Sequence, residues 1–145
     1  MFLGKHSSTL DKYNRLSTPV RFREELSSSI YISQGFDRNL LVLTRAAFQE
    51  IYRSVASLNI ADPVARVLLR LILGTAHEVR MDNNGYLTIP DELKEFAGLH
   101  GTIWLVGQGD YFEIWSTELW ENQEAQLKDA ETNSSRFSKL TVATR

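Results

Sequence analysis

The chain has 145 residues, of which 43% are hydrophobic and 23% are charged, a composition typical of a globular protein with its own buried core. It contains no cysteine, which excludes disulfides, thiolate metal sites and cysteine nucleophiles and favours a reducing, cytoplasmic environment. No segment approaches the roughly 20 consecutive apolar residues that span a bilayer. The first residues also lack the pattern of a secretory signal. The sequence therefore predicts a cytoplasmic protein without a membrane partner.

The formal net charge of −2 hides an asymmetry along the chain. Residues 1–80 contain 11 Lys and Arg against 7 Asp and Glu, whereas residues 81–145 contain 5 against 11. A basic first half is compatible with contact to a polyanion. Charge alone, however, favours an ordinary solvated surface, so this observation needs a motif beside it.

A ten-residue segment occurs twice, at residues 10–19 and again, altered, at residues 81–90. In each copy an aspartate, Asp11 or Asp82, precedes a turn and the segment ends in a proline. Turn signals and strand patterns then continue in the same order through both copies. The pattern predicts an internal duplication, with a first repeat at residues 1–58, a connecting helix at 59–76 and a second repeat at 77–128.

The first repeat has clear signals for strands, turns and helices. Asn14 can take the positive φ that a tight turn needs, and Thr18 followed by proline is typical of a helix N-terminus. The expected elements are strands at 2–10, 16–18, 30–32 and 40–43, and helices at 19–26 and 45–58.

The connecting helix has clear start and end signals, with Asp62 as N-cap, Pro63 at the first helical position and Gly74 at the C-terminal end. Its apolar residues are too widely spread for a helix with one buried face. This distribution predicts a helix that is buried on two sides, either between the repeats or against another subunit.

The second repeat follows the same order. Asn84-Gly85 is a strong hairpin signal, and Leu119, Trp120 and Leu127 have the spacing of a packed helix face. The expected elements are strands at 77–82, 102–106 and 111–115 and helices at 90–96 and 116–128. Residues 129–145 are polar without a sustained period, which predicts a flexible C-terminal tail. The predicted fold is α+β, a β-barrel of interleaved hairpins from the two repeats flanked by helices.

The chain resembles the MraZ family, bacterial transcriptional regulators built from two AbrB-like repeats. The segments that carry the resemblance are Met1-Phe2-x-Gly4, Leu10-Asp11 through Arg15-Leu16-Ser17-x-Pro19, Leu71-x-Leu73-Gly74-x-Ala76, Met81-Asp82-x-x-Gly85 and Phe112-Glu113-Ile114-Trp115. The resemblance implies a double-split or swapped-hairpin barrel, assembled into an octamer-like homo-oligomeric ring. It also implies a nucleoid-associated protein that binds short G-rich direct repeats of double-stranded DNA in the promoter of a cell-division and cell-wall gene cluster.

The family motif is Asp-x-x-x-Arg in each repeat, and the first repeat has it as Asp11 and Arg15. An arginine beside a tight turn presents a planar charged fork that can pair with guanine O6 and N7 or with a phosphate. We expect Arg15 to be the main DNA contact, while Asp11 accepts turn hydrogen bonds or pairs with Arg15. Further phosphate contacts are expected from Lys5, Lys12 and Arg80.

Both repeats depart from the motif. The second repeat keeps Asp82 and Gly85 but has Tyr86 where arginine is expected, and the first has Asn14 where glycine is expected. We therefore expect the repeats to be functionally unequal, with Arg15 far more important than Tyr86.

Other classes of function are less well supported. The chain has no phosphate-binding glycine loop, nucleophile elbow or catalytic carboxylate pair, so neither an enzyme nor a small-molecule cofactor is predicted. His6 and His77 occupy equivalent positions but lack companion ligands, which predicts no metal site. The alternative that remains is an oligomeric protein-interaction scaffold with weakened DNA binding, favoured by Tyr86.

Overall fold

The computed structural model describes residues 1–26 and 29–141. Its elements, in chain order, are β1 (Lys5–Thr9), β2 (Arg15–Ser17), α1 (Val20–Glu25), β3 (Ile30–Gln34), β4 (Leu40–Thr44), α2 (Arg45–Ala56), α3 (Pro63–Ile72), β5 (His77–Val79), β6 (Tyr86–Thr88), α4 (Asp91–Ala97), β7 (Thr102–Gly107), β8 (Tyr111–Ser116), α5 (Thr117–Lys128) and α6 (Ala130–Phe137). The fold is α+β, as the sequence predicts. No helix in the described part is both long and apolar enough to cross a membrane.

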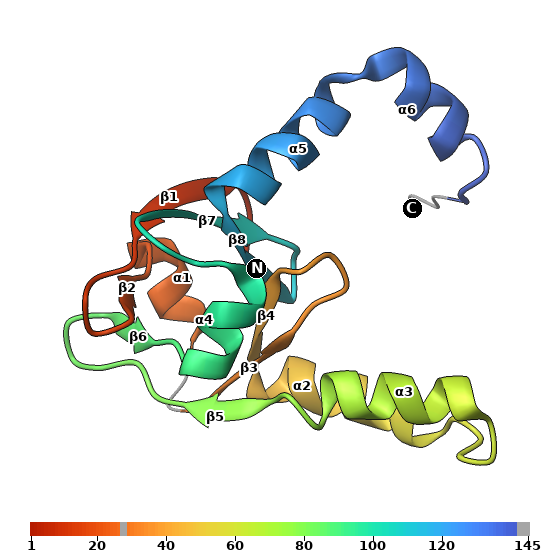
Figure 1. The fold of residues 1–145 in the computed structure, drawn as a ribbon, viewed down its shortest axis with the longest axis horizontal. Helices are drawn as coiled ribbons and strands as arrows, with labels where there is room; N and C mark the ends of the chain where they lie inside the picture. Colours follow the sequence, from red (N-terminus) through yellow and green to blue (C-terminus); the bar gives the residue numbers. More distant parts are fainter. Residues whose placement is uncertain (27–28, 142–145) are drawn as a thin grey trace.

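The strands of the two repeats are interleaved. Six of them form an antiparallel sheet in the order β1-β7-β8-β4-β3-β5, and β2 pairs with β6 in a separate two-stranded ladder. Strands from one repeat therefore pair repeatedly with strands from the other, as predicted (Figure 1). The predicted barrel does not close among the described residues, because β1 and β5 remain the two edges of the sheet.

Each aspartate turn is closed locally, because the Asp11 N–H donates to the Arg15 carbonyl and the Asp82 N–H to the Tyr86 carbonyl, both at 2.9 Å. In the first repeat one bridge, Leu10 to Leu16, also encloses the turn. The strands do not continue as a local hairpin, in contrast to the sequence-based prediction, because β1 pairs with β7 and β2 with β6. Leu16 and Leu87 face each other across the β2–β6 ladder, and both are 0% exposed. The strands thus separate locally because each buries its apolar residues against the other repeat.

One hydrophobic core serves both repeats. An aromatic cluster joins the N-terminal segment to the first short helix and the last hairpin: the ring of Phe2 lies 5.1 Å from that of Phe22 and 5.2 Å from that of Phe112. The other core residues come from both repeats and include Leu10, Leu16, Ile30, Ile32, Leu40, Val42, Leu87, Ile89, Leu93, Ile103, Leu105 and Ile114. Neither repeat supplies a complete core alone.

The N-cap predicted at Asp62 is confirmed, because its side chain accepts from the backbone N–H of Val64. Thr44 and Ser116 cap α2 and α5 in the same way. Thr18 does not cap α1, which begins after Pro19 without a side-chain cap. The Thr18 hydroxyl instead donates to the Gly85 carbonyl oxygen at 2.8 Å, a contact to the other repeat that the local pattern could not reveal.

The connecting helix α3 is not buried on two sides within this chain. It packs beside α2, and the two helices project together from the strands (Figure 1). Only Ala65 and Ile72 of α3 are buried, whereas Val64 is 75% and Val67 59% exposed. The broad apolar distribution is therefore present, but one side of it faces outward.

The C-terminal region also differs from its prediction. Trp120 of α5 is buried beside Trp115 and Trp104, but Leu127 is 62% exposed. The predicted flexible tail, 129–145, contains α6, which is capped by Asp129 and tied to α5 by a hydrogen bond from Asn133 Nδ2 to the Gln126 carbonyl at 2.6 Å. Residues 142–145 of that tail lie outside the described residues.

Candidate nucleic-acid interface

The β2–β6 ladder brings the two motif turns together. Its register pairs Arg15 with Thr88, Leu16 with Leu87 and Ser17 with Tyr86. Because side chains alternate along a strand, the leucines point into the core while Arg15 and Tyr86 share the opposite face. The loops that precede β2 and β6 accordingly lie side by side at one end of the molecule (Figure 1).

Asp11 organises the first turn. Its Oδ1 accepts from the backbone N–H groups of Tyr13 at 2.8 Å and Arg15 at 2.9 Å, and its Oδ2 accepts from Arg15 Nε at 2.9 Å. Asn14 has φ 61°, which confirms its predicted left-handed position. Both roles considered for Asp11, turn acceptor and partner of Arg15, are present.

These contacts shift both titration equilibria of the pair. Hydrogen bonds from the backbone and side chain of Arg15, together with its positive charge, lower the pKa of Asp11 below its ordinary value. The hydrogen bond and charge of Asp11 raise the pKa of Arg15 in turn, and Asp82 adds to this effect. The ion pair therefore persists at neutral pH.

The second turn has the same backbone design without the ion pair. Asp82 Oδ1 accepts from the backbone N–H of Asn84 at 2.8 Å and of Tyr86 at 2.9 Å, and Gly85 has φ 82°. The backbone hydrogen bond from Tyr86 is the largest cause of the lowered pKa of Asp82, and the positive charge of Arg15 contributes. Asp82 is thus a turn acceptor that lies within the electrostatic reach of the first turn.

Each turn is held by the backbone of the other repeat. The Thr18 N–H donates to the Gly85 carbonyl at 3.0 Å, and the Ile89 N–H donates to the Asn14 carbonyl at 2.8 Å. Thr18 and Ile89 are equivalent positions, as are Asn14 and Gly85. The two turns therefore form one unit with approximate internal symmetry.

Two cations that were not among the predicted site residues, Arg23 of α1 and Lys94 of α4, contact these turns. Arg23 Nε donates to the Thr18 carbonyl at 2.8 Å, and its guanidinium lies against Gly85, where a Cβ atom would collide with it. Lys94 Nζ donates to Asn14 Oδ1 at 2.9 Å. The sequence contains a signal for this pair of contacts, because a cation occurs at equivalent positions of the two repeats: Arg23 and Lys94 have the same separation as Asp11 and Asp82.

The remaining predicted cations are placed unequally. Lys5 pairs with Glu124 of α5, so its charge is already compensated. Lys12 is exposed beside the first turn, with Nζ 5.1 Å from the ring centroid of Tyr13. Arg80 is exposed just after β5, and within residues 1–26 and 29–141 it makes no ion pair.

A polar groove of about 640 Å³ adjoins the two turns. Its lining is rich in hydroxyl groups and includes one cation, Arg23: the residues are His6, Ser7, Ser8, Thr9, Asp11, Ser17, Thr18, Pro19, Val20, Arg23 and Tyr86. Hydroxyl and guanidinium groups of this kind are donors to phosphate and sugar oxygens. The groove therefore extends the polar surface beside Arg15 along β1.

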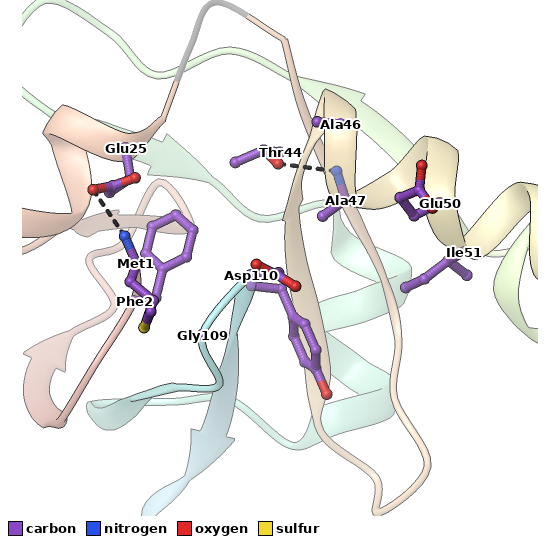
Figure 2. A pocket seen from close by; sticks show the side chains of 11 residues that line it. Met1, Phe2, Glu25, Thr44, Ala46, Ala47, Glu50, Ile51, Gly109 and Asp110 are labelled. Atoms are coloured by element: carbon purple, nitrogen blue, oxygen red, sulfur yellow. Dashed lines mark hydrogen bonds and ion pairs between the residues drawn. The ribbon is translucent and has the colours of Figure 1, made fainter. Parts of the chain in front are cut away.

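A second cavity, of about 590 Å³, lies away from the motif turns, between the N-terminus and the start of α2 (Figure 2). The terminal amine pairs with Glu25 at 2.9 Å, and Glu50 and Asp110 add further carboxylates to its lining. These three carboxylates outnumber the one terminal amine, so the lining has a net negative charge that does not favour phosphate. Among the described residues no group of three potential ligands could hold a metal ion.

Comparison with known proteins gives the family of the chain. The sequence profile of the family described as "MraZ protein, putative antitoxin-like" matches residues 1–71 and again residues 72–140. The chain belongs to the MraZ family. The two matches also confirm that it is built from two repeats.

Curated MraZ relatives align along nearly the whole chain. A protein of Roseiflexus castenholzii named transcriptional regulator MraZ is 38% identical over 138 residues, covering 95% of this chain and 94% of the relative. The protein of the same name from Thermomicrobium roseum is 38% identical over 131 residues, covering 90% of this chain and 92% of its own. The MraZ motif turns described above therefore lie in a chain whose relatives are named as regulators of transcription.

Proposed function

We propose that this MraZ chain is a sequence-specific DNA-binding transcriptional regulator whose main base contact is Arg15. The observation that carries the proposal is the geometry of the Asp11–Arg15 pair. Asp11 engages Nε, while within residues 1–26 and 29–141 the two terminal guanidinium nitrogens make no hydrogen bond. Those two nitrogens are the pair of donors that fits O6 and N7 of guanine, a contact worth about 1–3 kcal/mol of discrimination.

One subunit provides only modest electrostatic attraction. Around the two turns the cations Lys12, Arg15, Arg23 and Lys94 face the carboxylates of Asp11, Asp82 and Asp91. The local charge is thus nearly balanced, and a single turn reads few bases. We infer that affinity comes from several subunits that bind consecutive sites on one DNA molecule.

This inference leads to the form of the regulator. A homo-oligomeric, octamer-like ring would present its turns to short G-rich direct repeats in the promoter of a cell-division and cell-wall gene cluster, including the promoter of its own gene. The exposed apolar residues on and before α3, Ile60, Val64 and Val67, support self-association because water-exposed patches of this kind mark protein contacts. Such a regulator would act in the cytoplasm, associated with the nucleoid.

The test is titration of a fluorescent duplex from the region upstream of the gene for this chain, across a salt series. Arg15→Ala should abolish specific binding. It should also make the slope of log binding constant against log salt concentration less negative, by roughly 0.9 for each phosphate-like contact that is lost. Arg15→Lys should keep the salt dependence but lose discrimination between guanine-containing and substituted duplexes, because lysine lacks the planar fork. The matched control is Arg53→Ala. Arg53 lies on α2 and, like Arg15, is an arginine paired with a carboxylate, in this case Glu50.

The alternative function is a protein-interaction scaffold, favoured by the outward apolar side of α3. A wild-type protein that is oligomeric by light scattering but binds none of the duplex would support the scaffold. Equal binding by wild type and Arg15→Ala would remove Arg15 from the mechanism.

A further inference from the structure

Tyr86 stands where the first repeat has Arg15, and the ladder places the two side chains together. In the β2–β6 register Arg15 is opposite Thr88, so Tyr86 is its diagonal neighbour on the same face. Diagonal pairs of this kind are within reach of aromatic and long side chains. Tyr86 is half-buried, and its strand is fixed in the core by Leu87, so the ring is part of a rigid element.

The guanidinium of Arg15 lies at cation–π distance from two rings. Its Cζ atom is 5.3 Å from the ring centroid of Tyr86 and 5.3 Å from that of Tyr13. A cation within about 6 Å of an aromatic centroid is attracted by the ring. Together with the hydrogen bond from Nε to Asp11, these contacts restrain the guanidinium from three residues, one of which belongs to the other repeat.

We propose that Tyr86 is a positioning residue for Arg15, holding the guanidinium so that its terminal nitrogens face the DNA. This inference rests on the proposed function. It reverses the expectation that Tyr86 is a position of lost function: the two repeats form one composite site per subunit, in which the first supplies the fork and the second supplies the surface that orients it.

The physical gain is pre-organisation. A free arginine side chain loses rotamer entropy when it is fixed. Rings that restrict the side chain before DNA arrives remove part of that loss from the binding step. A fixed plane also discriminates better, because a bidentate contact to guanine needs both nitrogens in one orientation. Removal of the ring should therefore weaken base discrimination more than general attraction to DNA.

The first arm of the test observes Arg15 without DNA. In the NMR spectrum of the full chain, ring currents should displace the Arg15 δ-methylene and Nε–H signals from their ordinary positions. Tyr86→Ala should move these signals, whereas Tyr86→Phe should leave them nearly unchanged, because within the described residues the Tyr86 hydroxyl makes no hydrogen bond. Thr88→Ala, an exposed site on the same strand directly opposite Arg15, is the control.

The second arm measures discrimination between the upstream duplex and the same duplex with 7-deazaguanine, which lacks the N7 acceptor. Tyr86→Ala should lower this discrimination about 2- to 5-fold, the fold-change expected for an exposed cation–π contact. Tyr86→Phe should restore it, and Tyr86→Ala should have no further effect in an Arg15→Ala background. The salt dependence should stay at the wild-type value, because no charge is removed.

Three outcomes would overturn the proposal. The Arg15 signals could stay unchanged in Tyr86→Ala, or Tyr86→Ala could lower discrimination equally in the wild-type and the Arg15→Ala protein. The third outcome is an effect of Thr88→Ala as large as that of Tyr86→Ala. A wild-type chain that binds neither duplex would refute the proposed function instead. In that case the NMR arm still decides whether Tyr86 holds Arg15.

Discussion

At the scale of single residues, the two turns show how one backbone design accommodates different side chains. Asp11 and Asp82 accept equivalent backbone hydrogen bonds, and Asn14 and Gly85 take equivalent positive φ angles. The other positions differ, because Lys12, Tyr13 and Arg15 of the first turn correspond to Asn83, Asn84 and Tyr86 of the second. The shared backbone design therefore leaves the chemistry of each turn to these side chains.

The aspartates predict a specific acid response. Both have a lowered pKa in the folded chain, first because of backbone hydrogen bonds from Arg15 and Tyr86. Their stabilisation is complete above the ordinary pKa of about 3.8 and is lost as the pH falls through the lower folded value. Urea unfolding of wild type and of Asp11→Asn with Asp82→Asn should thus converge as the pH is lowered from 5 toward 2.

The difference between the two proteins is the required measurement, because other carboxylates also titrate there. The pKa of Glu113 is raised, mainly by burial, and this contributes stability in the opposite direction. A constant difference across this pH range would contradict the role of the aspartates.

Gly85 gives a second residue-scale prediction. Gly85→Ala should destabilise the fold by about 1–2 kcal/mol through its positive φ, and by more because Arg23 must move. Gly101→Ala is the control: Gly101 also has positive φ, 61°, but nothing lies within 4 Å of its added Cβ. Thermal unfolding of both variants measures the difference in stability. Equal losses of stability would show that the Arg23 side chain moves away from the added Cβ atom without destabilising the fold.

At the scale of elements, the attachment of α5 to the sheet shows how much one buried side chain can hold. Trp120 attaches α5, with its ring 5.8 Å from that of Trp115 and 6.5 Å from that of Trp104. The rest of α5 is largely exposed, and α6 follows it outward (Figure 1). Trp120 is the buried side chain that packs α5 on the sheet, and the exposed Lys5–Glu124 pair adds a polar contact beside it.

Trp120→Ala should therefore cost about 3–5 kcal/mol. Leu127→Ala on the same helix should change stability by no more than about 0.5 kcal/mol, because Leu127 is 62% exposed. Chemical denaturation followed by circular dichroism measures both. A similar loss for Leu127→Ala would indicate that α5 is covered by another subunit.

At the scale of the whole molecule, the interleaved topology makes the repeats interdependent. Strand β1 pairs with β7, β2 with β6 and β5 with β3, so each of these pairings joins the two repeats. The Leu16–Leu87 contact at the centre of the ladder is shared in the same way. The motif turns can adopt their paired arrangement only when both repeats are present.

Separate fragments of residues 1–60 and 61–145, divided between α2 and α3, should accordingly show no cooperative unfolding. Mixed in equal amounts, they should recover the circular dichroism and unfolding transition of the intact chain. Fragments that unfold cooperatively by themselves would show that each repeat has an independent core.

The sequence by itself determined the duplication, the α+β class, the order of the elements as far as α5, the left-handed Asn14 and the cap at Asp62. These features depend on local hydrogen bonds and backbone preferences, which a short segment specifies. Only the tertiary structure decided which strands pair, that Thr18 and Arg23 serve the opposite turn, and that Tyr86 lies against Arg15. Those contacts join positions about 70 residues apart, and their partners are chosen by burial of Leu16 and Leu87 in a shared core rather than by any local pattern.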